Sequence, residues 1–336
     1  MCSSDLVTII LLFIIVRDEQ DYYYYALLTV ITTAIICLMN WVHCRKYLSI
    51  RFTFDMGLKK HIKPIMVLFA NSIATIIYVS ADTTMLGIMS GDVAVGLYSI
   101  AGKIYSVTKK LLVAMYGAAV PRIAYFWGKG DIKSLRNVYS KLISNLIIIL
   151  LPASVGTICI AKEIILLMGG AEYAESVLTL QILSVALIGA ILGGAVTYGL
   201  NIPIGLEKYN LFATIISAGL NVLINVFILP IWKQNGAAFS TVISEFFVLI
   251  FCIVTNKKFL EFIDVRQISR SAFHAALGGV SIVVITYIVH LYITNSVLSM
   301  LMIIAFSIIL YMIELIALKN EFVFMILNKI KSKLSL

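Results

Sequence analysis

Apolar runs of about twenty residues recur along the whole of this 336-residue chain. A helix of that length, rising about 1.5 Å per residue, crosses the roughly 30 Å hydrocarbon core of a bilayer. Transmembrane strands would instead show alternating segments of about ten residues. The chain is 61% hydrophobic and 13% charged, whereas soluble domains are roughly half apolar and a quarter charged. The sequence therefore predicts an all-α, polytopic membrane protein.

The apolar runs predict about ten transmembrane helices. The first run is only eleven residues long and is too short to cross a bilayer by itself. No signal peptide with a basic start and a small-residue cleavage site precedes it. The expected spans are 6–16, 22–42, 62–89, 93–120, 139–161, 175–200, 209–230, 236–255, 271–292 and 296–318.

Lys and Arg are distributed unevenly between alternate loops. One set of loops holds twenty of the 26 basic residues, the other set holds only Arg17, Lys162 and Lys233, and three lysines lie inside a span. Because cytoplasmic loops are enriched in Lys and Arg, we expect the first set of loops and the C-terminus to be cytoplasmic. The net charge of +9 belongs to this pattern, so we expect no nucleic-acid partner.

Motifs of common catalytic and metal sites are absent from the sequence. It has no Ser/His/Asp set, no Walker loop, no nucleotide fingerprint and no metal-spaced histidines. We therefore expect neither an enzyme nor an ATP-driven pump, and no metal site. The cysteines form no CxxC pair and are expected to be small packing residues; they are Cys2, Cys37, Cys44, Cys159 and Cys252.

Charged residues occur inside three of the expected spans. Asp82, Lys103 and Glu245 are expected about 10–15 Å below the outer ends of their helices. Lys110 follows Lys103 by two turns and lies on nearly the same helix face. A charge at that depth costs at least about 2.5–3.5 kcal/mol unless it is paired or hydrated. We expect these four residues to face a protein interior or a water-filled cavity.

Two interpretations of these charges stay open. Asp82 and Glu245 could form interhelical salt bridges that only hold the bundle together. Lys103 and Lys110 are two cations on one face, more than one buried acid neutralises, and favour a hydrated path that attracts an anionic substrate. Lys109 points away from Lys110, and either a bend or a snorkelling side chain accounts for it as well as the path does.

Small and polar residues inside the spans predict helix packing. Gly189 and Gly193 have the GxxxG spacing of a close helix contact. Pro152 inside a span is expected to kink it. In-membrane amides are interpreted as interhelical hydrogen bonds in preference to sugar contacts; they are Asn71, Asn145, Asn221 and Asn225.

Two blocks of sequence resemble polysaccharide-type lipid flippases. The first, "ADTTMLGIMSGDVAVGLYSIAGKI" (Ala81–Ile104), has an Asp in the helix, Leu-Gly, a short outer turn and Val-Gly-x-Tyr-Ser-x-Ala, which include Gly87, Gly96 and Tyr98. The second block is Gly205–Phe247. It resembles the family in Asn221, Asn225, Pro230, Gly236, Ala237, Ala238 and Glu245. The chain is thus similar to the O-antigen and capsule repeat-unit flippases (Wzx type) of the multidrug/oligosaccharidyl-lipid/polysaccharide exporter superfamily.

The resemblance implies two facing six-helix lobes, with two further C-terminal helices in many members. On that pattern residues 7–61 are a remnant of the first lobe, 62–255 the second lobe, and 256–336 two C-terminal helices with a basic tail. Residues 1–6 ("MCSSDL") look like a translated sequencing adaptor, so we interpret them as a non-native start. A missing first lobe of the same protein is then an expected partner.

The resemblance further implies a flippase for polyprenyl-pyrophosphate-linked oligosaccharide in a bacterial or archaeal cytoplasmic membrane. Lys103 and Lys110 would attract the pyrophosphate, and Asp82 and Glu245 would hold those lysines in position or exchange a proton. Tyr98 and Asn71 are expected along the same path. No cofactor is implied beyond proton or sodium coupling. A drug or cation antiporter, a lipid II flippase and, less favoured, a membrane-bound glycan polymerase remain alternatives.

Overall fold

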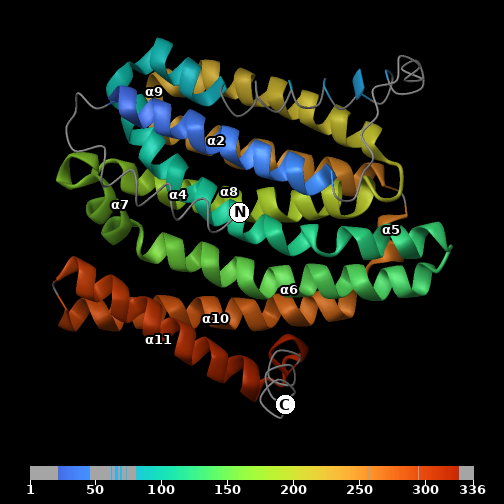
Figure 1. Cartoon of the computed structure of the whole chain (residues 1–336). Helices are drawn as coiled ribbons and strands as arrows, with labels where there is room; N and C mark the ends of the chain where they lie inside the picture. Colours follow the sequence, from blue (N-terminus) through green and yellow to red (C-terminus); the bar gives the residue numbers. More distant parts are fainter. Residues whose placement is uncertain are drawn as a thin grey trace. The chain divides into compact units, whose positions relative to one another are not determined.

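The computed structural model describes residues 22–45, 62, 65, 66, 69, 73, 81–256, 258–293 and 295–324. Every element within those ranges is helical. The chain divides into two compact units, Met1–Lys63 and Pro64–Leu336. In the first unit the described element is α2 (Tyr22–Arg45), which matches the expected span 22–42 (Figure 1).

The second unit contains a succession of long helices joined by short connections (Figure 1). A helical segment at 81–90 leads through Gly91, whose φ of 85° suits glycine, into the first long helix. The elements that follow are α4 (Asp92–Gly117), α5 (Val120–Gly128), α6 (Ile132–Cys159), α7 (Ala161–Gly169), η2 (Ala171–Tyr173), α8 (Ser176–Val196), η3 (Thr197–Asn201), α9 (Glu207–Thr255), η4 (Phe259–Phe262), α10 (Val265–Tyr292) and α11 (Ser296–Ala317).

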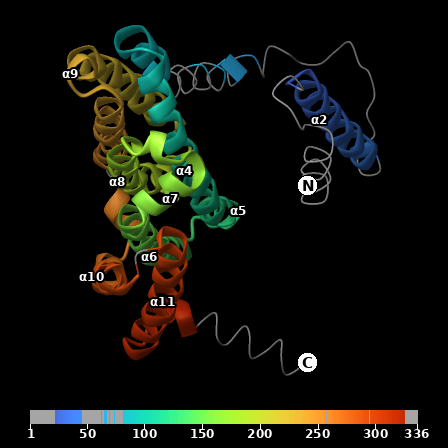
Figure 2. The same ribbon diagram turned by 90° about the vertical axis from the view of Figure 1, so that its left-hand side faces the viewer.

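The middle of the second unit is formed by α6 and α8. Helix α8 contacts α4, α6 and α9, while α6 contacts α10, which in turn contacts α11. Figures 1 and 2 both show α9 and α10 on opposite sides of the α6–α8 pair. The largest buried cluster joins Leu135, Tyr139 and Leu146 of α6 to Leu187 and Ile191 of α8. This packing explains why these two helices are apolar on more than one face.

The outer surface of the second unit is also apolar. Val93, Ile231 and Val280 expose 78%, 78% and 63% of their surface, and a soluble protein would bury such a surface in a partner. The described residues include six helical stretches long and apolar enough to cross a bilayer. They are Asp92–Gly128, Ile132–Cys159, Ser176–Asn201, Glu207–Thr255, Val265–Tyr292 and Ser296–Ala317. The expected all-α, polytopic membrane protein is confirmed.

Helix α9 is a hairpin of two helices that meet at Lys233. That residue has φ 45° and ψ −127°, outside the helical region, so the two expected spans 209–230 and 236–255 stay separate. Gly236 permits the close return, because a Cβ there would lie 2.9 Å from Ile228 Cγ2 and 3.1 Å from the Ile228 carbonyl oxygen. Pro230 lies in the last turn before the break at Lys233.

Several helices begin earlier than their apolar runs predict. Helix α6 starts at Ile132 instead of 139 because the side chain of Asp131 accepts a hydrogen bond from the Ser134 amide (3.0 Å) and caps it. Helix α10 starts at Val265 instead of 271 for the same reason, with Asp264 as the cap. The apolar runs mark the membrane-embedded part, and the polar first turns extend beyond it.

Pro152 does not interrupt α6, which continues to Cys159. The proline has no N–H, so the carbonyl of Ile148 four residues earlier lacks its helical donor. The Tyr311 hydroxyl of α11 donates to that carbonyl at 2.8 Å. Tyr311 reaches it by crossing α10 at Gly278, where any Cβ would collide with the tyrosine ring.

The GxxxG spacing at Gly189 and Gly193 marks a close helix contact, as expected. A Cβ on Gly189 would lie 3.0 Å from the Phe246 amide nitrogen, and one on Gly193 would lie 3.6 Å from the Leu249 nitrogen. The two glycines thus let α8 approach the backbone of the second half of α9. This contact fixes the height of Glu245, which precedes Phe246.

Candidate functional site

Asp82 is the centre of a buried polar cluster between the 81–90 segment, α4 and α9. Its surface is 5% exposed. The Asn225 amide donates to Oδ1 at 2.7 Å, and the hydroxyls of Thr241 and Tyr98 donate to Oδ2 at 2.8 and 3.1 Å. All three donors are neutral, and no described lysine, arginine or histidine forms an ion pair with this carboxyl group.

The cluster continues along the α9 hairpin through two fully buried amides. Asn225 Nδ2 lies 3.2 Å from Asn221 Oδ1, and Asn221 Nδ2 donates to Ser240 Oγ at 3.2 Å. The interhelical hydrogen bonds expected of Asn221 and Asn225 are therefore present. Asn225 Oδ1 is buried and accepts no hydrogen bond from any described residue, which leaves a free acceptor beside the Asp82 carboxyl.

This arrangement suits a single positive charge. A carboxylate among apolar helices needs a proton or a cation to balance it, and the cluster offers only neutral donors. The oxygens of Asp82, Asn225 and Thr241 are hard ligands of the type that alkali and alkaline-earth cations prefer. The described residues contain no group of three His, Cys, Asp or Glu side chains placed to hold a metal ion.

Glu245 lies one helical turn beyond Thr241 and forms an ion pair with Lys109. The Lys109 Nζ to Glu245 Oε1 distance is 2.8 Å, and the Tyr105 hydroxyl lies 3.3 Å from Nζ and 3.4 Å from Oε1. The Glu245 side chain is 12% exposed and that of Lys109 is 33% exposed. The interhelical salt bridge thus uses Lys109, the lysine to which the sequence assigned no definite role.

The expected pairing of Asp82 and Glu245 with Lys103 and Lys110 is wrong. Asp82 is bound by neutral groups and Glu245 by Lys109, as described above. The reason is helix geometry. Lys103 and Lys110 are seven positions apart and therefore share one face of α4, and that face is turned away from α9.

Lys103 and Lys110 are exposed, together with Val107 (60%) and Leu111 (71%) of the same α4 face. Within the part of the chain that the structure describes, neither lysine forms an ion pair or a hydrogen bond. The two cations therefore lie on an exposed face of α4, next to Val107 and Leu111. Tyr98, expected on the same path, is instead buried against Asp82. Asn71 lies outside the described residues.

The motif glycines have unequal structural roles. Gly87 would place a Cβ 3.4 Å from Val95 Cγ2, an ordinary contact, and Gly96 has nothing within 4 Å of such an atom. The turn between the two helices depends on Gly91 instead, through its positive φ.

Sequence patterns alone did not assign three residues to this site: Tyr105, Lys109 and Thr241. A signal existed on α4, because Tyr98, Tyr105 and Lys109 are spaced by seven and four residues and so share one helix face. That face is the one that meets the α9 hairpin.

The fold and these buried charges define a polytopic α-helical membrane protein with an ion-paired and hydrogen-bonded interior. The family described as polysaccharide biosynthesis protein matches residues 3–178 of the chain. The chain belongs to this family, and the expected relationship to polysaccharide-type flippases is confirmed.

One known protein matches about half of the chain, and one solved structure matches most of it. The "Probable low-salt glycan biosynthesis flippase Agl15" of Haloferax volcanii is 26% identical over 178 residues, which are 52% of this chain and 37% of that protein. The structure titled "Lipid II flippase MurJ, inward closed conformation" matches with a TM-score of 0.66 at 15% identity. That match covers 93% of this chain and 64% of the MurJ chain. The chain thus spans less than two thirds of either protein, and the MurJ likeness shows the fold.

Proposed function

We propose that the chain is part of a flippase that moves a polyprenyl-pyrophosphate-linked oligosaccharide, such as an O-antigen or capsule repeat unit, to the outer leaflet. Membership of the polysaccharide biosynthesis family and the similarity to Agl15 support this proposal. The protein would act as a transporter, without catalytic chemistry. The basic loops and the C-terminus would face the cytoplasm, in a bacterial or archaeal cytoplasmic membrane.

The observation that carries the proposal is the exposed pair Lys103 and Lys110. Two ammonium groups in the middle of a membrane-spanning helix need water or an anion beside them. No carboxylate in the described residues pairs with them. A pyrophosphate linkage carries negative charge through the bilayer, and two cations two turns apart would give it successive binding positions.

The mechanism follows from these positions. The glycan and pyrophosphate would pass along the open α4 face while the polyprenyl tail stays in lipid, with alternating access between two lobes. The other wall of the path would come from a first lobe of the same protein. Asp82 would exchange a proton or a sodium ion with one side of the membrane, since its cluster offers oxygen ligands and no fixed cation. Neutralising or restoring the charge of the Asp82 carboxyl group would change how α4 packs against α9.

A double substitution of the two lysines tests the proposal in cells that depend on this gene for surface glycan. We expect Lys103→Ala with Lys110→Ala to reduce surface glycan at least about tenfold, because a hydrogen bond to a charged group is worth about 1.5–3 kcal/mol. The double Arg variant should retain most export. Lys133→Ala, an exposed lysine at the start of α6, is the matched control. Unchanged glycan at equal protein level would refute the lysine path.

The same cells distinguish the substrate class. Accumulation of lipid-linked repeat unit on the inner side, with normal peptidoglycan, is the expected result of the loss. Accumulation of lipid II would assign the chain to the alternative lipid II flippase, and altered drug efflux with normal glycan would assign it to the antiporters.

A further inference from the structure

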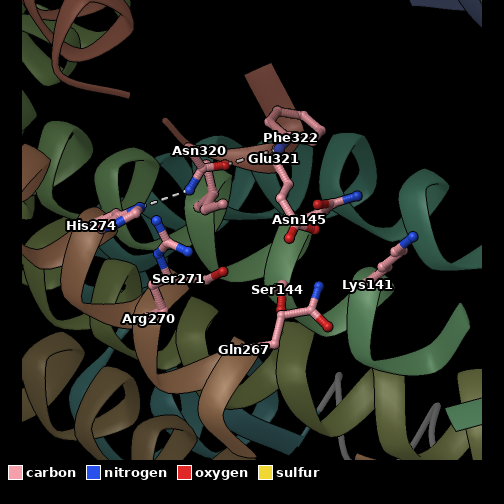
Figure 3. A pocket seen from close by; sticks show the side chains of 11 residues that line it. Lys141, Ser144, Asn145, Gln267, Arg270, Ser271, His274, Asn320, Glu321 and Phe322 are labelled. Carbon is pink, nitrogen blue, oxygen red and sulfur yellow. Dashed lines mark hydrogen bonds between the residues drawn. The ribbon is translucent and has the colours of Figure 1, made fainter. Parts of the chain in front are cut away.

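A second polar site lies away from the Asp82 cluster, between α6, α10 and the residues that follow α11. It is a pocket of about 160 Å³. Figure 3 shows Lys141 and Asn145 on one side, Arg270 and His274 on another, and Asn320 to Phe322 closing a third. About 10–15 Å³ of such volume accommodates one water molecule, so the pocket has room for a tetrahedral phosphoryl group.

The pocket contains a buried hydroxyl with no partner. Ser144 is 2% exposed, lines the pocket, and its Oγ has no hydrogen bond within the described residues. Serines inside helices usually donate back to the carbonyl four residues earlier, as Ser184 does to Leu180. A buried hydroxyl without a partner is costly, so Ser144 offers an unused hydrogen-bond donor at the wall of the pocket.

The charges around the pocket favour an anion. Arg270 and Lys141 supply two cations, while Glu321 supplies one carboxylate, and none of the three belongs to an ion pair of the described chain. The amides of Asn145 and Gln267 add further donors. A guanidinium, an ammonium, a hydroxyl and two amides together match the several acceptor oxygens of a phosphate group.

The backbone at the third side of the pocket is held in place. Helix α11 ends in a left-handed turn at Lys319 (φ 51°), with the Asn320 amide bonded to the Leu315 carbonyl (2.9 Å). A non-glycine residue in that region costs free energy. The turn directs the Asn320 side chain to His274 Nδ1 at 2.8 Å, and its Oδ1 accepts the Phe322 amide at 3.0 Å. The pocket is therefore closed by an ordered segment.

We propose that this pocket binds a phosphate group at the basic end of α6 and α10, contacted by Arg270, Lys141 and Ser144. Lys141 and Arg270 lie in the N-terminal parts of α6 and α10, next to connections rich in Lys and Arg, so the proposed site lies towards the membrane surface on that side. Basic pockets between transmembrane helices hold anionic lipid head groups in this position. The same chemistry would serve a soluble phosphate, and the two sources are separated experimentally.

The full chain, purified in detergent, is measured by native mass spectrometry after incubation with vesicles of phosphatidylglycerol or phosphatidylcholine, or with inorganic phosphate. We expect retained phosphatidylglycerol to fall about tenfold or more in Arg270→Gln and in Ser144→Ala. Arg266→Gln, an exposed neighbour outside the pocket, is the matched control and should behave like the unmodified chain.

The outcomes separate the sources and can overturn the proposal. Phosphatidylglycerol retention that inorganic phosphate does not displace identifies a lipid head group. If the chain binds inorganic phosphate and loses that binding in Arg270→Gln and Ser144→Ala, the ligand is a soluble phosphate. If retention of both is unchanged by Arg270→Gln and Ser144→Ala, the proposal is wrong. Ser144→Ala removes a hydroxyl with no protein partner, so the melting temperature should not fall with it, and a folding defect cannot imitate loss of binding.

Discussion

The Asp82 carboxyl group is held by neutral donors alone, since Asn225, Thr241 and Tyr98 carry no charge. Asp82→Asn keeps the shape of the side chain, and the two hydroxyls can turn to accept from the new amide. We expect the melting temperature of the detergent-purified protein to change little. Glycan export should fall about tenfold or more and lose its response to an imposed proton or sodium gradient.

A second variant of this cluster separates coupling from packing. Tyr98→Phe removes one donor and keeps the carboxyl group, so it should cost about 0.5–1.5 kcal/mol of stability while the gradient response remains. Asp82→Asn export that still follows the gradient would remove Asp82 from the coupling mechanism.

Lys109 and Glu245 should be energetically coupled, whereas Lys103 and Glu245 should not. In a double-mutant cycle with Lys109→Met and Glu245→Gln, we expect a coupling of about 1 kcal/mol, since one third of the lysine side chain is exposed and solvent weakens the pair. The cycle is measured by thermal unfolding in one detergent. The matched cycle with Lys103→Met should give a value near zero, and equal values in the two cycles would contradict the geometry.

At the residue scale, the sequence predicts which side chains are buried and polar better than it predicts their partners. Asp82, Glu245, Asn221 and Asn225 are recognisable because polar groups inside apolar runs must be satisfied. Which lysine pairs with Glu245 depends on the rotation of α4 about its axis. That rotation is set by tertiary packing, and here it directs Lys109 inward.

At the element scale, Tyr311 of α11 packs its ring against α10 and donates a hydrogen bond to α6. We expect Gly278→Ala to displace the Tyr311 ring, deprive the Ile148 carbonyl of its donor, and cost about 1–3 kcal/mol in thermal unfolding. Gly279→Ala is the matched control, since its Cβ would meet Val155 at an ordinary 3.5 Å.

The cause of that loss is testable within the same series. In a Tyr311→Ala background the ring is gone, so Gly278→Ala should have little further effect on the melting temperature. A loss of equal size in both backgrounds would show that the glycine is needed for another reason.

Helix ends and turns show the limit of hydropathy at this scale. The apolar runs locate the spans but omit the capped polar turns at Asp131 and Asp264. The hydropathy pattern predicts a break between the spans 209–230 and 236–255, and the residue that leaves the helical region within that gap is Lys233. The apolar runs therefore locate a turn without identifying its strained residue.

At the scale of the whole molecule, the alternation of basic loops makes a topological prediction. The loop with Lys133 and the one with Lys258 belong to the basic set, whereas Lys233 lies in the other set. Between Lys133 and Lys233 the chain passes through α6, α8 and the first half of α9, and between Lys233 and Lys258 through the second half of α9. An odd number of crossings separates Lys233 from each of the others.

Single cysteines at these three positions, in a background without the natural cysteines, test that topology in intact cells. We expect a membrane-impermeant maleimide to label the Lys233→Cys variant directly, because its loop carries few cations and faces outward. The Lys133→Cys and Lys258→Cys variants should be labelled only after the membrane is permeabilised. The opposite pattern would invert the orientation and reverse the direction of the proposed transport. Labelling of all three from outside would mean that α9 does not form two membrane crossings, and the Asp82 cluster would then have no place between the leaflets.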